Sequence, residues 1–349
     1  MASYELLREL MELPGPTGQE HRVLAWLRER WAGRAERVWR SKVGNLLAHV
    51  GGRGPTLLLQ GHADEIGFVV RAIDERGFLW LASGQADGTP RLRYPVGQPA
   101  LVVGRGDPVA GVFATATGHV LTEAQRAREK LEYTDFFVDI GAASREEALA
   151  QGIHVGAGVI WNPPTRRVGS RIYGKAIDDR VALAIMTELL EGLDPAALAY
   201  DLYLAATVQE EIGLVGATSL RADLDADLAI AIDNGPVGDV PTLGAQQLPT
   251  ALGDGPALVH KDRRVHYDYD LLWRLAEVAG RAGIPVQHAV FERFGSDGAA
   301  LLQQGIPTAL VALSTRYTHS AFEMVDERDI DATLRLLRAF LTTPPEDAR

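Results

Sequence analysis

The chain has 349 residues, 46% of them hydrophobic, and a formal net charge of −11 from 46 acidic and 35 basic residues. This length and composition indicate a globular protein of about two domains, and the negative charge argues against a nucleic-acid partner, whose phosphates attract basic surfaces. The sequence contains no cysteine, which excludes disulfides, iron–sulfur clusters, thiolate zinc sites and a cysteine nucleophile.

The N-terminal stretch MASYELLRELMELPG places charges and leucines at helical spacing. It lacks the basic start and apolar centre of a signal peptide. No uncharged apolar run reaches the roughly 18 residues that a membrane span requires. We therefore expect a cytoplasmic protein with no membrane partner.

In the first part of the chain, Thr17 and Glu20 have the spacing of a capping box and predict a helix at about residues 19–31. Strand-like runs follow at residues 37–41, 45–50 and 56–60. The last of these, TLLLQ, is almost wholly apolar, which favours a central position in a sheet.

From about Phe68 to Pro164 the pattern changes to short apolar runs separated by Gly, Pro and Asp. This predicts a small β-rich unit with one or two short helices. Ser144 and Glu147 form a second capping box at the start of one such helix.

After NPPTRR, longer segments with helical and strand patterns alternate again along the chain. Helices are predicted at about residues 179–191, 269–283, 297–305 and 330–341, and strands at 201–209, 227–233, 286–292 and 308–313. This order predicts an α/β fold, with a central sheet covered by helices on both faces. The β-rich unit interrupts that α/β domain.

Acidic and imidazole side chains follow the predicted core strands or begin the helix between them. In open α/β sheets, ligands bind in the crevice at the carboxyl ends of the strands. The candidate residues are His62, Asp64, Asp178, Asp179, Glu210, Glu211, Asp233 and His319.

Each candidate has an ordinary structural explanation when taken alone. The glutamate pair could occupy a solvated turn, Asp178 could cap a helix, Asp233 could shape the turn before Asn-Gly, and either histidine could be structural. Their recurrence at one strand end after another favours a shared metal site.

Two imidazoles and several carboxylates suit Zn²⁺, Co²⁺ or Mn²⁺ better than Ca²⁺ or Mg²⁺. Two metals about 3.5–4 Å apart can bind an attacking hydroxide and a carbonyl oxygen together. One of the paired glutamates can then bind metal while the other accepts the proton of the water. Asp64 can accept the other ring N–H of His62 and orient it.

Other chemistries have weaker support. The sequence has neither a GxSxG nor an HExxH motif. VVGRGDPVAG contains a GxG without the third glycine of a dinucleotide site. Adjacent glutamates do not suit a glycosidase, whose two carboxyl groups flank a sugar, although Glu210 with a remote Asp leaves that alternative open.

Six ordered motifs resemble the TET-type, self-compartmentalising di-metal aminopeptidases, a family labelled glutamyl aminopeptidase or endoglucanase. The motifs are GHADEIGFVV, KAIDDR, VQEEIGLVGA, AIDNGPVGD, RFGSDGAALLQQGIPTALVAL and RYTHSAFEMV. The resemblance covers nearly the whole chain. It implies a di-zinc exopeptidase-like catalytic domain, with a mixed sheet, formed by residues 1–67 and 168–349, and an inserted dimerisation domain at residues 68–167.

The resemblance also implies roles for single residues. Asp178 would bridge two divalent metal ions, with His62 and Asp233 completing one site and Glu211 and His319 the other. Glu210 would be the general base and Asp64 the residue behind His62. The implied activity is removal of N-terminal residues from short peptides by a homo-oligomer, a dodecamer built from dimers.

Two departures from the resemblance lie near the expected substrate pocket: Ser-Asp-Gly at residues 296–298, where relatives commonly have Thr-Asp-Ala, and Ala321, where Pro often stands. Neither departure changes an expected ligand. Alternatives with the same ligands are a deacylase and a carboxypeptidase-like amidohydrolase. A non-enzymatic shell protein is a further alternative.

Overall fold

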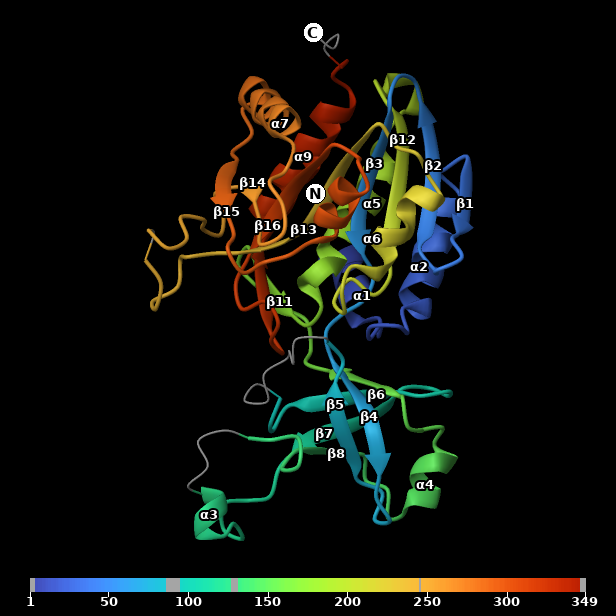
Figure 1. The fold of residues 1–349 in the computed structure, drawn as a ribbon, viewed down its shortest axis with the longest axis vertical. Coiled ribbons are helices and arrows are strands. Elements are labelled where there is room, and N and C mark those ends of the chain that lie inside the picture. Colours follow the sequence, from blue (N-terminus) through green and yellow to red (C-terminus); the bar gives the residue numbers. More distant parts are fainter. Residues whose placement is uncertain (1–3, 86–94, 127–130, 245, 346–349) are drawn as a thin grey trace.

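The computed structural model describes residues 4–85, 95–126, 131–244 and 246–345. An α/β unit contains both ends of the described chain, and a smaller β-barrel lies against one end of it (Figure 1). None of the helices in these ranges is long and apolar enough to cross a membrane.

The α/β unit is built on an eight-stranded mixed sheet with the order β1-β2-β12-β3-β13-β16-β14-β15. Its strands are β1 (Arg37–Arg40), β2 (Leu46–Gly52), β3 (Thr56–His62), β12 (Asp201–Thr207), β13 (Leu228–Pro236), β14 (Ala257–Lys261), β15 (Gln287–Val290) and β16 (Thr308–Thr315). The four central strands β12, β3, β13 and β16 are parallel to one another. Their carboxyl ends therefore share one edge, the edge that faces the barrel (Figure 1).

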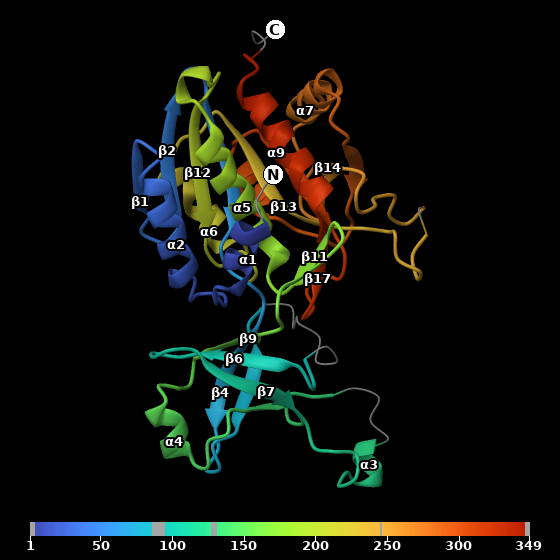
Figure 2. The ribbon, with the colours of Figure 1, turned by 180° about the vertical axis from the view of Figure 1, so that it is seen from behind.

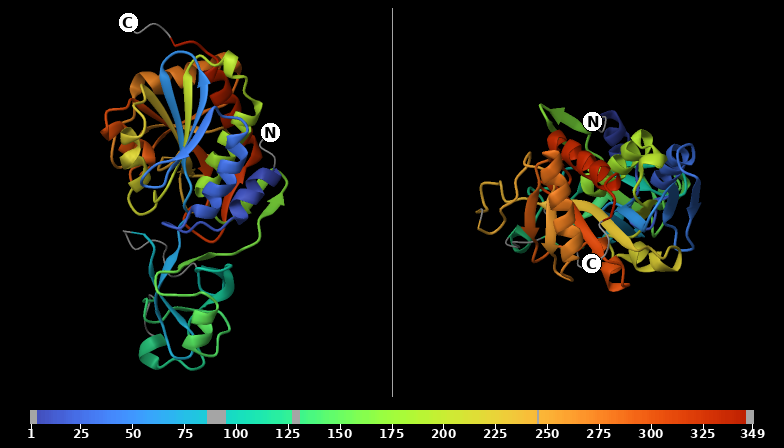
Figure 3. Two further views of the ribbon diagram at one scale, coloured as in Figure 1. Left: turned by 90° about the vertical axis from the view of Figure 1, so that its right-hand side faces the viewer. Right: turned by 90° about the horizontal axis from the view of Figure 1, so that it is seen from above.

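Helices cover both faces of this sheet, as the sequence predicts (Figure 3). One face carries α1 (Tyr4–Glu12), α2 (His21–Ala32), α5 (Ile177–Gly192), α7 (Tyr269–Ala282) and α9 (Glu327–Leu341). The other face carries the shorter α6 (Val215–Ser219) and α8 (Asp297–Gln303). Single 3-10 turns lie at η1 (Pro195–Ala197) and η2 (Leu220–Ala222).

Helix α5 is buried along most of its length because it lies between β3 and the outer helices α1, α2 and α9 (Figure 2). Its residues from Val181 to Leu190 are buried except Glu188, as expected of a helix that is apolar on all sides. This packing fixes the start of α5, where Asp178 and Asp179 stand, against the carboxyl end of β3.

The barrel is closed, with the strand order β4-β5-β8-β7-β6-β9. Its strands are β4 (Phe68–Ile73), β5 (Leu79–Ser83), β6 (Pro99–Val103), β7 (Val109–Ala114), β8 (Phe137–Asp139) and β9 (Gly158–Trp161). Phe68, Phe113, Phe136 and Trp161 pack in its centre, with ring centroids 5.4–6.1 Å apart. The barrel thus has an aromatic core of its own.

Two short helices accompany the barrel, α3 (Glu123–Arg126) and α4 (Arg145–Ala150). Half of the capping box predicted at α4 is confirmed, because the Ser144 hydroxyl accepts a hydrogen bond from the Glu147 N–H at 3.2 Å. The Glu147 carboxylate accepts the N–H of Ala143, at 2.8 Å, instead of that of Ser144. After the barrel, β10 (Arg166–Val168) and β11 (Arg171–Gly174) form a three-stranded sheet with β17 (Glu323–Asp326). This small sheet brings the chain back to α5.

Candidate active site

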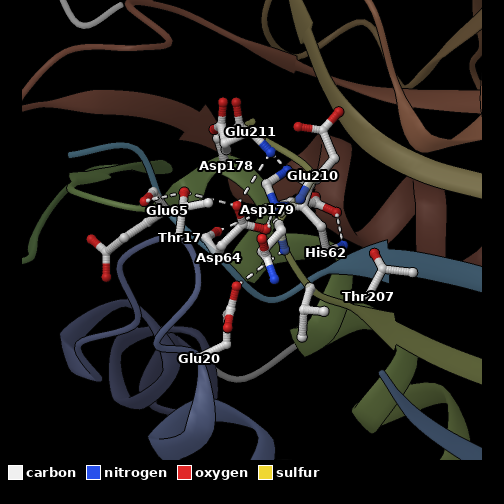
Figure 4. Close-up of polar contacts among 12 residues, drawn as sticks. Thr17, Glu20, His62, Asp64, Glu65, Asp178, Asp179, Thr207, Glu210 and Glu211 are labelled. Atoms are coloured by element: carbon white, nitrogen blue, oxygen red, sulfur yellow. Dashed lines mark hydrogen bonds and ion pairs between the residues drawn. The ribbon is translucent and has the colours of Figure 1, made fainter. Parts of the chain in front are cut away.

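The candidate side chains from different parts of the sequence meet at the shared edge of the four parallel strands (Figure 4). His62 ends β3 and lies in register with Thr207, the last residue of β12. Asp233 lies near the end of β13, and His319 follows β16. Parallel pairing therefore gathers them in one place.

Asp178 stands between two groups of possible ligands. One group is His62, Asp178 and Asp233, and another is Asp178, Glu211 and His319; within each, the ligand atoms lie within 4.8 Å of one another. His62 Nε2 is 3.0 Å from Asp178 Oδ1. His319 Nε2 is 3.5 Å from both Asp178 Oδ2 and Glu211 Oε2.

Glu210 belongs to a third group of the same size, with His62 and Glu211. The chain leaves the sheet before this pair, because Gln209 has a left-handed backbone with φ of 56°. Both adjacent glutamates can thus reach the same cluster, which two consecutive residues of a regular strand could not do.

Asp64 orients both His62 and the glutamate pair. The Asp64 carbonyl oxygen lies 3.2 Å from His62 Nδ1, so the other ring nitrogen, Nε2, faces the cluster. The Asp64 carboxylate accepts hydrogen bonds from the backbone N–H groups of Glu210 at 3.0 Å and Glu211 at 3.2 Å. Asp64 is fully buried.

The capping box predicted at Thr17 and Glu20 is wrong. Helix α2 begins at His21 with no side-chain cap. The Thr17 hydroxyl instead donates to Asp64 at 2.9 Å, and Glu20 accepts the N–H groups of Gly18 at 2.7 Å and Gln209 at 3.0 Å. These two residues therefore support the active-site loop rather than the helix.

Glu323, at the start of β17, is a supporting residue of the site that the sequence patterns do not predict. Its carboxylate accepts the Asp178 N–H at 2.9 Å and the His319 N–H at 3.1 Å. It is 2% exposed, so it fixes the backbone beneath two possible ligands without contacting solvent. Nothing in its local sequence distinguishes it from a surface acid before a strand.

Asp179 and Asp297 are further buried acids beside the cluster. Asp179 Oδ2 accepts the His62 N–H at 3.1 Å, and its Oδ1 has no hydrogen-bond partner among the described residues. Asp297 Oδ2 accepts hydrogen bonds from Thr207 and Gln60. Neither belongs to the ligand groups. Both are buried, and their hydrogen bonds hold residues of β3 and β12 next to the cluster.

Burial and mutual repulsion shift the protonation of these acids. Burial raises the pKa of Glu211 to about 8 and that of Asp233 to about 7, and the charge of Asp178 adds to both shifts. Burial also raises the pKa of Glu210. For Asp178, burial is outweighed by hydrogen bonds from His319 and His62, which hold its pKa below the usual range.

This donor set fits divalent cations. Buried carboxylates repel one another unless positive charge compensates them, and Glu211 Oε1 is buried with no hydrogen-bond partner in the described part of the chain. Imidazole nitrogen together with carboxylate oxygen suits Zn²⁺, Co²⁺ and Mn²⁺.

We expect Glu323→Gln to weaken cation binding by about 10–100-fold, the range found when a group that orients a ligand is lost. Glutamine offers one acceptor where two backbone N–H groups now bind a carboxylate. Equilibrium dialysis against Zn²⁺ measures the change. Glu327→Gln is the matched control, since Glu327 pairs with Arg167 at 2.7 Å on the surface. Equal affinities in the two variants would contradict the assignment.

Comparisons with known proteins show the family of this chain. The profile of the M42 glutamyl aminopeptidase family matches residues 44–336. The lysyl aminopeptidase of Pyrococcus furiosus is 30% identical over 350 residues, which cover 98% of this chain and 97% of that protein.

Solved structures are also similar. The TET aminopeptidase of the archaeon Thaumarchaeota archaeon SCGC AB-539-E09 has a TM-score of 0.90 and 30% identity, over 97% of this chain and 95% of that one. The TET1 peptidase of Pyrococcus horikoshii, which can assemble into a tetrahedron or a large octahedral shell, has a TM-score of 0.85 and 27% identity, over 97% and 98% of the two chains.

Proposed function

This chain belongs to the M42 glutamyl aminopeptidase family, and we propose that it removes N-terminal residues from short peptides with two divalent cations and Glu210 as the general base. The peptide-hydrolase class follows from the family. The observation that carries the finer proposal is the position of Asp178 between two ligand groups that share no other residue.

In this proposal His62, Asp178 and Asp233 hold one cation, and Asp178, Glu211 and His319 hold the other. Zn²⁺ or Co²⁺ suits these ligands, and Mn²⁺ is a further candidate. When bound, such a pair supplies Lewis acidity that acidifies a water and stabilises a negatively charged oxygen.

The side chains of the protein then perform the proton transfers. Glu210 accepts a proton from the water whose oxygen attacks the peptide carbonyl carbon. When the bond from that carbon to the leaving nitrogen breaks, Glu210 returns the proton to the nitrogen. The hydrogen bond from the Glu210 N–H to Asp64 keeps this residue in place.

An apolar pocket beside the proposed metal-binding residues supports a preference for certain N-terminal side chains of the peptide. A cavity of about 430 Å³ borders Asp178 and His319. Most of its other walls are apolar, with two charged residues, Glu292 and Arg293, of opposite sign beside them. The apolar residues are Pro236, Leu243, Leu248, Val290, Phe291 and Phe294. We propose that it receives the N-terminal side chain of the peptide and favours leucine, methionine or phenylalanine over aspartate or lysine.

We expect metal-stripped protein to be inactive on a panel of aminoacyl-p-nitroanilides and to regain activity when Co²⁺ or Zn²⁺ is added. Leucine and phenylalanine substrates should then give the largest kcat/KM. N-acetylated leucine p-nitroanilide is the control, because an aminopeptidase requires the free amine. Release of acetate from the acetylated substrate, with the anilide bond left intact, would favour the deacylase alternative. Release of reducing sugar from an oligosaccharide without metal would favour a glycosidase.

The inserted unit, residues 68–167, which contains the barrel and the first two residues of β10, is proposed as a dimerisation domain. Val112, Leu149 and Val155 expose between 49% and 65% of their surface there, and burial of such side chains against a second copy would be favourable. Dimers of this kind are the proposed units of a dodecamer. Sedimentation velocity measures the assembly.

A further inference from the structure

The cleft contains a set of basic residues that the proposed chemistry does not use. Arg263 and Arg264 follow β14, and Arg293 follows β15. All three line a cavity of about 250 Å³ together with Glu210 and His62. The same cavity is lined by four acids, Asp178, Glu210, Glu211 and Asp233. The proposed cations would compensate these carboxylates, which leaves the three arginines as the cationic side chains of the cleft that the chemistry does not use.

The backbone of the first two arginines is fixed. Asp262 is fully buried and accepts the N–H of Arg264 and the hydroxyl of Tyr267 at 2.8 Å. The Arg263 N–H donates to the Phe294 carbonyl oxygen at 3.0 Å, which ties this turn to the loop that carries Arg293. The two loops therefore present their arginines together.

The guanidinium groups have no such partners. All three residues are exposed, and none of the three groups forms a hydrogen bond or ion pair within the described ranges. Arg264 Nε lies beside Gly295, which lines the same cavity. A Cβ added at Gly295 would be 3.6 Å from this nitrogen. The N–H donors of these guanidinium groups line the cleft. Because no described protein group engages them, they are available to a ligand.

The position of this cavity suits the part of a peptide that lies beyond the cleaved bond and leaves after hydrolysis. The apolar pocket for the N-terminal side chain lies toward Phe291 and Leu248. The second cavity shares Asp178, Arg293, Phe294 and His319 with that pocket. It differs in reaching Glu210 and the segment Ile212–Leu214, where the general base would meet the leaving nitrogen. A cavity of about 250 Å³ is smaller than the 300–1,000 Å³ typical of drug-sized ligands, so it holds a short segment.

We propose that Arg263, Arg264 and Arg293 bind a carboxylate carried by the leaving part of the peptide. This inference rests on the proposed aminopeptidase function and narrows its substrates to peptides with a negative charge just beyond the cleaved bond. Arginine suits this role because its planar fork binds carboxylates through paired hydrogen bonds. Two sources supply such a group: the free C-terminus of a dipeptide and an acidic second residue.

Matched substrates separate these sources. Leu-Ala against Leu-Ala-amide tests the terminal carboxylate, and Leu-Asp-amide against Leu-Asn-amide tests the side chain. We expect kcat/KM to be about tenfold or more higher for the charged member of at least one pair, in line with a charge-assisted hydrogen bond. The difference should shrink as salt is added, because the contact is exposed.

The double variant Arg263→Gln/Arg264→Gln tests the residues themselves. The ratio of kcat/KM within the discriminating pair should fall toward one, mainly through KM. Arg335→Gln on α9 is the control and should keep the ratio, because Arg335 is an exposed arginine 3.9 Å from Asp331. Circular dichroism checks that both variants fold.

Leucine p-nitroanilide has no carboxylate, so its hydrolysis tests the proposed aminopeptidase function independently of the carboxylate site. Its hydrolysis together with equal rates within both peptide pairs would overturn the carboxylate site and leave the aminopeptidase standing. Failure of the metal-loaded protein on the anilide and on all four peptides would overturn the proposed function, and the inference with it. A ratio that persists in the double variant would also refute the arginine assignment.

Discussion

Glu210→Gln is expected to retain both cations and to lose about 10²–10⁴-fold in kcat, the range that a positioned general base contributes. Glutamine has nearly the shape of glutamate but cannot accept the proton of the water. The hydrogen bond between the backbone of residue 210 and Asp64 does not involve the replaced side chain, so the loop should keep its position.

The measurement combines steady-state kinetics on leucine p-nitroanilide with metal analysis of the same sample. Glu277→Gln is the matched control, because Glu277 lies on the surface of α7, 3.2 Å from Arg281. It should change neither quantity. Normal turnover by Glu210→Gln would remove Glu210 from the role of base, whereas loss of metal would make Glu210 a ligand.

The general form of the fold could be predicted from the sequence because it follows from local patterns. Apolar runs such as TLLLQ predict central strands, and helices with an apolar face predict the covering layers. The parallel pairing of β3 with β12 and β13 then places polar residues after these strands at one edge. The prediction of a cluster there depended on this regularity.

Support for the site could not be predicted in this way, because it comes from contacts that are distant in sequence. The spacing of Thr17 and Glu20 is that of a helix cap, but their partners Asp64 and Gln209 lie 47 and 189 residues away. Glu323 reaches Asp178 across 145 residues. Local sequence cannot distinguish a cap from such a contact. A threonine hydroxyl can accept a hydrogen bond in a cap or donate one, as Thr17 does to Asp64, and the Glu20 carboxylate would accept a backbone N–H in either case.

Closure of the barrel is a second feature without a local signal. Its short strands were predicted from alternating apolar runs and turn residues. The pairing of β9 with both β4 and β6 closes the sheet, and β9 is far from either strand in the sequence. Packing of Phe68 against Trp161 across that closure depends on the same long-range pairing.

Asp178→Ala is expected to remove both cations, whereas His62→Ala and His319→Ala should each remove one. Of the two groups proposed to hold cations, Asp178 alone belongs to both, and each histidine belongs to one. His62 and Glu211 also form the third group with Glu210, which is assigned to the base. Losing a shared carboxylate leaves each cation with fewer ligands and leaves the remaining acids without compensating charge. Metal analysis after dialysis should give stoichiometries of about zero, one and one against two for the unaltered chain.

A thermal measurement tests the same assignment independently. A ligand that binds only the folded state stabilises it by about 2.7 kcal/mol at a free concentration of 100 times Kd, so Zn²⁺ should raise the Tm of the unaltered chain and leave that of Asp178→Ala unchanged. Asp201→Ala is the matched control, because Asp201 also contacts a histidine, His49, at 2.7 Å, but at the start of β12, away from the cluster. It should keep two cations and the response to zinc. Two bound cations in Asp178→Ala would contradict the bridging role. One bound cation would show that Asp178 serves a single site. The stoichiometry therefore decides whether Asp178 is shared by two cations or the two cations bind through separate ligands.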